Sequence, residues 1–358
     1  MLPLILKLPF YYLARKTNKI SKLPFNLTLS VTYRCNSRCK TCNVYEKDCE
    51  ELSLPQWKQI FKKFGKNLLW ATISGGEPFL RTDLAEIVYA LYDYCRPQII
   101  NIPTNGILTK TIVEQIKKIT AYCQNSQIIV NVSIDDIGQK HDGIRGIDGN
   151  YDKTILTFNA LKGLRLDNLS VGIHTVISKF NVKRIPDIYA ELIKLAPDSY
   201  ITEIAEEREE LGTIDSGIGP GYNDFVNAID FLLDKIKQDN FNRVGRLTRA
   251  FRIEYYKIVK QVLKEKKQII PCYAGFASAQ VSPEGNVWMC CIKAQVCGNL
   301  KAVDYDFKKI WDSELTRNLR KSIIAQECYC PLANASYTNM LFSIKTLFKI
   351  LKNLIRLK

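Results

Sequence analysis

Short β-rich runs alternate with longer amphipathic runs between residues 26 and 205, and this alternation restricts the fold more than any other feature of the sequence. The β-rich runs predict six strands, at 27–32, 70–74, 99–104, 128–134, 169–177 and 200–204. The stretches between them, including 54–64, 84–94 and 111–123, have the pattern of amphipathic helices. Repeated strand–helix units of this length form parallel sheets. The sequence therefore predicts an α/β fold, a partial (β/α)6 TIM-like barrel whose loops after the strands share one rim.

The rest of the sequence divides the chain into further predicted segments around this barrel. An apolar and basic segment covers residues 1–25, and the barrel extends over 26–235. Helices are expected at 222–238 and 243–268, and a helical linker is expected at 236–270. Residues 271–335 combine strand-like pieces with six cysteines and predict a small metal-dependent domain. A basic amphipathic helix is expected at 336–358.

The chain contains twelve cysteines, and ten of them fall into two groups far apart in the sequence. One group extends from Cys35 to Cys49 and the other from Cys272 to Cys330. A chain of 358 residues is far too long for a disulfide-stapled miniprotein, so the grouping indicates metal ligation in a reducing compartment. Only two histidines are present, which leaves thiolates as the expected ligands.

Cys35, Cys39 and Cys42 lie in the loop that follows the first predicted strand. Three thiolates on a short loop bind three irons of a 4Fe–4S cluster. The fourth iron then remains open to a ligand that is not part of the protein. The same spacing also occurs in zinc knuckles and among buried free thiols, so the triplet alone leaves these alternatives open.

Glycine and polar residues follow the next three predicted strands, at the rim where such barrels place their chemistry. Consecutive glycines let a backbone approach a ligand closely, and the carboxylate after them can bind an ammonium group. An arginine in the connection after the fourth strand can bind a carboxylate through two hydrogen bonds. The candidate cofactor-binding residues are Gly75, Gly76, Glu77, Pro78, Asn105, Ser133, Asp135 and Arg145.

These elements, in this order, resemble the radical S-adenosylmethionine (SAM) superfamily, and more narrowly the branch with a C-terminal SPASM or twitch-type auxiliary-cluster domain. The resemblance covers residues 26–331. It implies that Cys35, Cys39 and Cys42 hold the catalytic 4Fe–4S cluster. It further implies that residues 75–78 bind the amino group of SAM and that Arg145 binds its carboxylate. One departure is Thr41, because many members have an aromatic residue before the third cysteine.

The resemblance also implies a reaction. A radical SAM enzyme cleaves SAM reductively at the cluster to methionine and a 5′-deoxyadenosyl radical, and the radical abstracts hydrogen from the substrate. Such an enzyme needs an external electron donor of the flavodoxin or ferredoxin type. A zinc-binding interaction protein is the non-enzymatic alternative.

The second cysteine group is similar to a SPASM domain, which implies auxiliary iron–sulfur ligation. One auxiliary cluster is expected rather than two, because residues 333–335 are Ala-Asn-Ala where further ligands would stand. A structural zinc ion is the alternative. Cys49, Cys95 and Cys123 are expected to be ordinary thiols. The preferred ligands are Cys272, Cys290, Cys328 and Cys330, and Cys297 is able to replace one of them.

Lys and Arg number 51 against 36 Asp and Glu, so the net charge is +15 and an anionic partner is expected. The final helix places Leu341, Ile344, Phe348, Leu351 and Ile355 on one face, and no acidic residue follows Met340. This pattern is typical of a helix lying on anionic lipid, although packing on the barrel is equally compatible with it. The sequence has neither a secretory signal nor a run long enough to cross a bilayer. We therefore expect a cytoplasmic protein with peripheral contact at the inner face of the membrane.

The substrate is the least constrained part of the prediction. The termini favour a membrane-associated or lipid-linked molecule. A peptide- or protein-modifying maturase is one alternative, weakened because the 25 residues before the barrel are too few for a leader-binding domain. An RNA-modifying enzyme is another, but no added nucleic-acid-binding domain is visible, so nucleic acid is disfavoured as a partner. His141 and His174 are expected to be structural, and the candidate substrate contacts after the sixth strand are Glu203, Glu206, Glu207 and Arg208.

Overall fold

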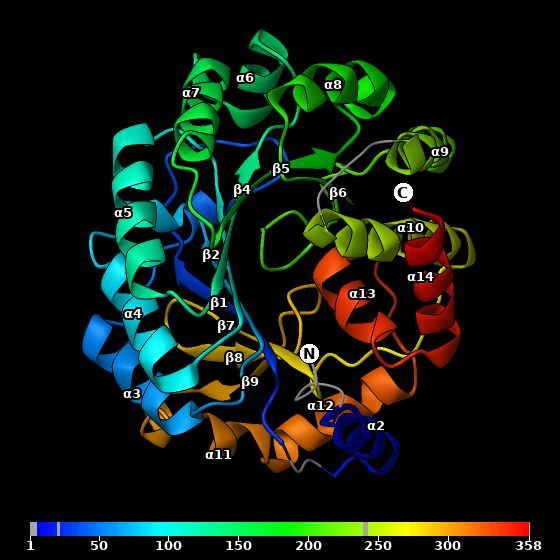
Figure 1. Cartoon of the computed structure of the whole chain (residues 1–358). Helices are drawn as coiled ribbons and strands as arrows, with labels where there is room; N and C mark the ends of the chain where they lie inside the picture. Colours follow the sequence, from blue (N-terminus) through cyan, green and yellow to red (C-terminus); the bar gives the residue numbers. More distant parts are fainter. Residues whose placement is uncertain (1–5, 20–21, 239–242, 358) are drawn as a thin grey trace.

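The computed structural model describes residues 6–19, 22–238 and 243–357. Its centre is a parallel sheet in which the first six strands lie side by side in chain order. The strands begin and end within one residue of the predicted positions. They are β1 (Asn26–Thr32), β2 (Trp70–Gly75), β3 (Ile99–Thr104), β4 (Gln127–Ser133), β5 (Leu169–Ile177) and β6 (Ser199–Ile204). The predicted α/β fold with a partial barrel is confirmed, because the sheet curves without closing on itself (Figure 1).

Helices from the connections between strands cover the outside of the sheet and form an arc in Figure 1. A capping box of Ser53 and Gln56, with Pro55 in the first turn, explains why the first of these helices begins where predicted. Its buried face consists of Trp57, Ile60, Phe61 and Phe64. The helices of the arc are α3 (Leu54–Phe64), α4 (Leu84–Cys95), α5 (Thr109–Tyr122), α6 (Gln139–Arg145), α7 (Asn150–Lys162), α8 (Ile185–Leu192) and α9 (Tyr222–Gln238).

The two faces of the sheet differ in polarity. In β1, Leu27, Leu29 and Val31 are buried in the apolar core, which also contains the inner faces of α3 and α4. The residues between them are polar. They point to the inside of the barrel, because successive side chains of a strand lie on opposite faces of the sheet. On this inner face Asn131 donates a hydrogen bond to Asn101 across 2.8 Å, and Asn101 lies 3.5 Å from Thr72. The inside of the barrel is therefore lined by polar side chains rather than filled by an apolar core.

The cysteine-rich segment extends the barrel sheet. Strand β7 (Ser278–Val281) pairs with β1 in parallel, so that Asn26 lies opposite Ser278. Strands β8 (Asn286–Trp288) and β9 (Val296–Asn299) then continue the sheet in antiparallel fashion. Two short helices, α11 (Phe307–Trp311) and α12 (Glu314–Ile324), follow at the lower edge of Figure 1. The expected domain boundaries at 235, 270 and 335 remain predictions.

Two helices close the side of the barrel between β6 and β1. Helix α10 (Arg243–Glu265) contacts β6, where the hydroxyl groups of Tyr256 and Thr202 form a hydrogen bond of 2.5 Å. Helix α13 (Ala333–Met340) contacts β1, where Asn334 donates a hydrogen bond of 3.0 Å to Thr28 Oγ1. The Ala-Asn-Ala sequence that stands where further cysteines would be expected therefore begins a helix of the barrel wall. Figure 1 shows both helices beside the open edge of the sheet.

The first and last helices lie on the outside of this assembly. Helix α2 (Leu8–Thr17) packs Tyr11 against Phe25, which precedes β1. Helix α14 (Ile344–Arg356) packs on α10, with Asn353 donating a hydrogen bond of 2.9 Å to Glu254. Residues 1–5, 20, 21 and 358, which belong to the predicted terminal segments, lie outside the described residues. None of the described helices is long and apolar enough to span a bilayer.

Candidate functional site

The first cysteine group lies in the loop that leaves the carboxyl end of β1. Cys42 N–H donates a hydrogen bond of 3.1 Å to Cys39 O, which forms a tight turn between the second and third thiols. Ser37 N–H lies 3.4 Å from Cys35 Sγ and can donate to it. All three thiols are partly shielded from solvent. The loop thus presents three sulfur atoms at the rim of the barrel, as predicted.

Neighbouring segments hold this loop on both sides. Arg38 N–H and Lys40 N–H donate hydrogen bonds of 2.9 Å and 2.8 Å to the carbonyl groups of Arg145 and Ile144, at the end of α6. Asn43 N–H donates a hydrogen bond of 2.8 Å to Leu211 O, in the connection after β6. The conformation of the loop therefore depends on contacts with residues more than 100 positions away.

Burial controls the protonation of the three thiols. It raises the pKa of Cys35 to about 11 and that of Cys42 to about 12, and it also raises the pKa of Cys39, where Arg145 opposes the effect. Metal ligation requires thiolates, so iron would have to displace these protons. Within the described ranges, no three His, Cys, Asp or Glu side chains are arranged to hold a single metal ion. A cubane binds each thiolate to a different iron, which requires wider spacing, and the donor set of three thiols fits it.

Gly75 and Gly76 allow the end of β2 to approach the loop after β1. A Cβ atom on Gly75 would lie under 3.0 Å from Thr32 O, and one on Gly76 would lie under 3.0 Å from the carbonyl oxygens of Tyr33 and Arg34. Gly76 N–H and Glu77 N–H donate hydrogen bonds of 2.8 Å and 2.9 Å to Thr32 O and Arg34 O. Glycine at positions 75 and 76 therefore allows close contact with the protein's own backbone, and the approach to a ligand stays a prediction.

Glu77 is fully buried between the ends of β2 and β3. Its carboxylate accepts hydrogen bonds from Thr104 Oγ1 at 3.0 Å, Asn105 N–H at 2.7 Å and Phe79 N–H at 3.3 Å. Burial raises the pKa of Glu77 to about 7, against the effect of these donors. Both oxygens thus already contact the protein, and the carboxylate orients Asn105. The side chain of Asn105 in turn donates to Asn36 Oδ1 at 2.7 Å and lies 3.9 Å from Cys35 Sγ.

Asp135 and Arg145 form a buried ion pair beside the cysteine loop. Arg145 Nε lies 2.8 Å from Asp135 Oδ2, and Arg145 Nη1 lies 3.8 Å from Cys39 Sγ. Burial alone lowers the pKa of Arg145, but Asp135 and Cys39 raise it above its ordinary value. Ser133, the last residue of β4, lies opposite His174 in β5. The predicted candidates Asn105, Asp135 and Arg145 are therefore gathered around the thiols.

His141, which is predicted to be structural, contacts this ion pair through the backbone of Asp135. It is fully buried, its Nδ1 accepts a hydrogen bond of 3.1 Å from Asp135 N–H, and its ring packs against Tyr151. Burial, assisted by Arg145, lowers the pKa of His141 to about 4. The folded state therefore favours the neutral ring, and its contribution to stability is complete above the ordinary pKa of 6.5 and is lost as the pH falls toward 4.

We expect a His141→Asn variant, whose Oδ1 can replace Nδ1 as the acceptor, to have weaker pH dependence of stability. Between about pH 7.5 and about pH 5, the free energy of unfolding of the wild type should fall by about 2 kcal/mol more than that of the variant. Anaerobic urea unfolding at the two pH values measures the difference. Equal losses in both proteins would contradict the assignment of a neutral buried ring.

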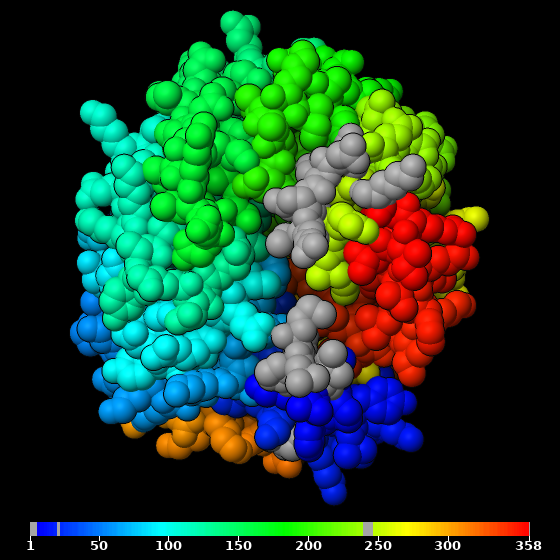
Figure 2. All heavy atoms as spheres, in the orientation of Figure 1, coloured from blue at the N-terminus to red at the C-terminus, as the bar shows by residue number. Residues whose placement is uncertain are grey.

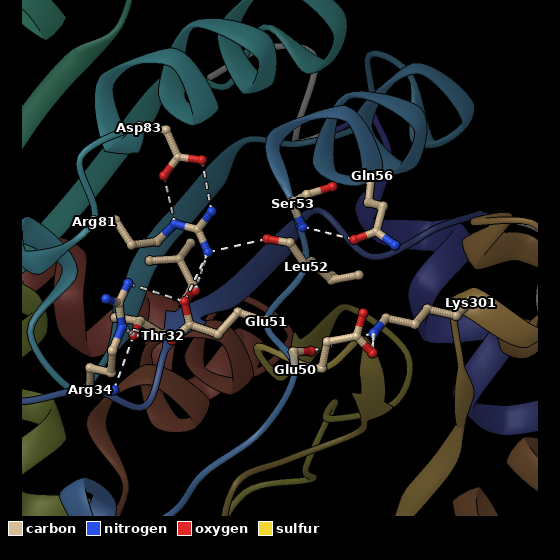
Figure 3. A network of polar contacts seen from close by, with 11 residues as sticks. Thr32, Arg34, Glu50, Glu51, Leu52, Ser53, Gln56, Arg81, Asp83 and Lys301 are labelled. Carbon is tan, nitrogen blue, oxygen red and sulfur yellow. Dashed lines mark hydrogen bonds and ion pairs between the residues drawn. The ribbon is translucent and has the colours of Figure 1, made fainter.

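A polar network stabilises the start of the cysteine loop (Figure 3). Arg81 binds both carboxylate oxygens of Asp83 at 2.8 Å and lies 3.3 Å from Glu51. Its guanidinium also donates to Val31 O in β1, at 3.0 Å. Glu51 contacts Thr32 Oγ1 and lies 3.3 Å from Arg34, the residue before Cys35. The network therefore fixes the end of β1 relative to the segments before α3 and α4.

The second cysteine group brings its four preferred ligands together. Burial and the neighbouring Cys290 and Cys328 raise the pKa of Cys272 to about 12. Burial also raises the pKa of Cys330, to which Cys272 and Cys290 are neighbours. The side chain of Gln268 connects two of these segments, because it accepts a hydrogen bond from Cys272 N–H at 3.2 Å and donates one to Cys328 O at 3.1 Å.

Cys297 and Cys291 have different surroundings. Cys297 is buried in the main core, and Thr316 and Arg320 lie close enough to oppose the rise of its pKa that burial causes. Cys291 is buried beside Leu332 and Ala335, and its Sγ lies 3.8 Å from Arg208 Nη1. This contact could not be predicted from the sequence, because 83 residues separate its two members.

The connection after β6 lies between the two cysteine groups. Arg208 is largely buried and lies 3.9 Å from Glu206 and 4.0 Å from Glu210. Burial raises the pKa of Glu206 to about 7. Glu207 instead accepts hydrogen bonds from backbone N–H groups of its own loop, at 2.7 and 3.0 Å. Of the four predicted substrate contacts, Glu207 therefore shapes the loop, whereas Glu206 and Arg208 point into the protein.

Glu203 and His174 face the inside of the barrel from the neighbouring strands β6 and β5. Glu203 Oε2 lies 3.6 Å from His174 Nε2, and burial lowers the pKa of His174 although Glu203 opposes this shift. His174 was expected to be a structural residue of the strand. It lies on the polar inner face, one strand from Ser133, and its structural role stays a prediction. The signal that could have found it is the alternation along β5, which puts His174 on the same face as Gly172.

Comparisons with known families match both halves of this arrangement. Residues 29–192 match the family described as the radical SAM superfamily. Residues 272–331 match SPASM, described as an iron–sulfur cluster-binding domain. The two matches contain the two cysteine groups.

Individual relatives agree with these matches. The chain is 30% identical over 190 residues to the Fe-coproporphyrin III synthase of Methanosarcina barkeri, covering 51% of this chain and 43% of the relative. It is 25% identical over 310 residues to the antilisterial bacteriocin subtilosin biosynthesis protein AlbA of Bacillus subtilis, covering 83% and 61%. The matched region thus spans less than two thirds of either relative. Streptococcus suis SuiB, solved with the precursor peptide SuiA, has a similar fold, with a TM-score of 0.66, 16% identity and coverage of 87% and 70%.

Proposed function

This chain belongs to the radical SAM superfamily and carries a C-terminal SPASM domain, and on that basis we propose that it cleaves SAM reductively and uses the resulting radical to modify a peptide. The observation that carries the proposal is the convergence of Asn105 and Arg145 on the three thiols after β1. When bound, the reduced 4Fe–4S cluster supplies the electron that splits SAM into methionine and a 5′-deoxyadenosyl radical.

The residues of the chain divide the work of binding and orientation. Cys35, Cys39 and Cys42 would hold the cluster, and their three thiolates would supply no ligand for a fourth iron. Arg145, kept charged by Asp135, binds the carboxylate of SAM. The turn from Gly75 to Pro78 faces its amino group, and Ser133 lies at the rim for its remaining polar groups.

The test of SAM cleavage is anaerobic. We expect the protein, reconstituted with iron and sulfide and reduced with dithionite, to release 5′-deoxyadenosine from SAM. A colourless preparation that binds zinc and leaves SAM intact would support the zinc-binding alternative instead.

The second cysteine group is proposed to hold one auxiliary iron–sulfur cluster. We expect about eight irons per chain in the wild type, and about four in Cys272→Ala, Cys290→Ala, Cys328→Ala or Cys330→Ala. Cys297→Ala should keep about eight, because its thiol lies in the apolar core. Anaerobic iron and sulfide assays measure these contents. About four irons in the wild type would contradict the auxiliary cluster. Loss of iron in Cys297→Ala would show that Cys297 replaces one of the four proposed ligands.

Two of the three similar proteins described above support a peptide over the lipid-linked substrate that the termini suggested. The relative with the wider coverage of this chain takes part in the biosynthesis of a bacteriocin. SuiB, whose fold is similar to that of this chain, was solved with a precursor peptide. We propose that Glu203, His174 and Arg208 contact this peptide, because Glu203 and His174 lie 3.6 Å apart on the polar inner face and Arg208 lies 3.8 Å from Cys291 in the second cysteine group.

Mass spectrometry of a peptide encoded beside the gene, after incubation with enzyme, SAM and reductant, tests the substrate. We expect a mass change that requires both SAM and the three cysteines. An unchanged peptide together with a modified lipid or other small molecule would contradict the peptide proposal. The electrons are proposed to come from a flavodoxin- or ferredoxin-type donor in the cytoplasm.

A further inference from the structure

The last helix exposes an unbroken apolar stripe. Ile344, Phe348, Leu351 and Ile355 are 73%, 69%, 52% and 76% exposed, and they lie on one face of α14 because they follow the spacing i, i+4, i+7, i+11. Leu341, the fifth member of the predicted stripe, is partly buried instead. Large apolar side chains of a soluble protein are rarely exposed together in this way.

The docking of α14 on the protein does not use this stripe. Ile350 belongs to the apolar core, and Leu347 and Leu354 pack against it. Arg246 donates a hydrogen bond of 3.2 Å to Leu357 O. The helix therefore packs on α10 through its opposite face. The predicted packing of this helix on the protein therefore leaves its apolar stripe exposed.

The first helix repeats the pattern. Leu6, Phe10 and Leu13 are between 48% and 67% exposed and follow the spacing i, i+4, i+7 through the turn that leads into α2. The opposite face of α2 is anchored by Tyr11, whose hydroxyl donates a hydrogen bond of 2.6 Å to Leu23 O. The aromatic rings of Tyr11 and Phe342 lie 6.2 Å apart, so α2 adjoins the start of α14. Figure 2 shows the two helices next to each other on one face of the molecule.

The charge of these two segments has one sign. The first 25 and the last 19 residues each contain five basic residues and no acidic one, and so provide ten of the fifteen excess positive charges. On α14 the basic side chains are exposed. They are Lys345, Lys349, Lys352 and Arg356, and in the part of the chain that the structure describes none of these four forms an ion pair.

We propose that the joined surface of α2 and α14 binds an anionic lipid bilayer. Apolar side chains flanked by lysines are the arrangement that places a helix in the interface of such a bilayer. A second copy of the chain is disfavoured as the occupant, because a two-fold contact through this surface would bring its basic residues together. The inference rests on exposure and charge and does not depend on the chemistry proposed above.

Flotation of the full-length protein with vesicles tests the proposal. We expect binding to phosphatidylcholine vesicles that contain phosphatidylglycerol, weaker binding at high salt, and little binding to phosphatidylcholine alone. Phe348→Ser with Leu351→Ser should lower the partition coefficient at least about tenfold, and Phe10→Ser with Leu13→Ser should act in the same direction. Lys349→Glu with Lys352→Glu should remove the preference for the anionic lipid.

Leu156→Ser is the matched control, because Leu156 is 60% exposed on α7 and lies outside the surface. It should bind vesicles like the wild type, and circular dichroism should show that all variants are folded. Three results would overturn the proposal: equal binding to both lipid compositions, unchanged binding after the paired serine substitutions, or a dimer of the wild type that these substitutions dissociate. SAM cleavage, measured on the same preparations, separates a failure here from a failure of the enzymatic proposal.

Discussion

We expect Cys39→Ala to abolish the release of 5′-deoxyadenosine from SAM and to lower the iron content by about four atoms per chain. This result is expected because the thiol is the central member of the triplet, and because its Sγ lies 3.8 Å from Arg145 Nη1. Loss of a ligand should exceed the roughly 10- to 100-fold effect of removing an outer partner of a metal site. Chromatography of the anaerobic reaction, normalised to folded protein, measures the effect.

Cys95→Ala is the control for loss of a buried thiol. Cys95 lies in the apolar core on α4, where its Sγ contacts only Phe61 O at 3.5 Å among the hydrogen-bond acceptors of the described residues. This variant should keep its iron and its activity. A Cys39→Ala protein that still cleaved SAM, or a Cys95→Ala protein that did not, would contradict the assignment of the catalytic cluster.

We expect Gly76→Ala to lower the free energy of unfolding by about 3 kcal/mol and to reduce incorporation of the catalytic cluster. The added Cβ would lie under 3.0 Å from the carbonyl oxygens of Tyr33 and Arg34. Both are backbone atoms at the start of the cysteine loop, so either the loop or the end of β2 must move. Urea unfolding and the iron content of the reconstituted protein measure the two effects.

Gly143→Ala is the matched substitution at a glycine that has space. Nothing lies within 4 Å of the position of its Cβ, and the residue is inside α6, where alanine is favourable by up to about 1 kcal/mol. We expect equal or slightly higher stability and normal iron content. If both alanine variants were equally stable, the close packing of β2 against the loop would be wrong.

Local pattern was sufficient to predict the barrel and the candidate site near it. The alternation of strands and helices placed each strand of the barrel to within one residue, because turn chemistry and periodicity are properties of neighbouring residues. The cysteine spacing and the residues after β2, β3 and β4 indicated the rim for the same reason. Parallel strands bring their carboxyl ends together, so Asn105 and Arg145 had to lie near Cys35 and Cys39.

Contacts between distant segments were not predictable in this way. The hydrogen bonds of Glu77 to the end of β3, the approach of Arg208 to Cys291, and the pairing of β7 with β1 all depend on the packed structure. The outward direction of the apolar stripe on α14 is a further case. Helical periodicity identified the stripe, but only the contacts of Ile350 and its neighbours show which face of the helix is covered.

Helices α10 and α13, which close the open side of the barrel, are held in place differently from the strands that carry the cysteine loop. These helices form the wall between β6 and β1 through side-chain hydrogen bonds, such as that of Asn334 with Thr28. A helix held in this way can shift or change its side chains without disturbing the backbone pairing of the strands that carry the cysteine loop. We therefore expect sequence differences among homologues to concentrate at this wall rather than in the cysteine loop.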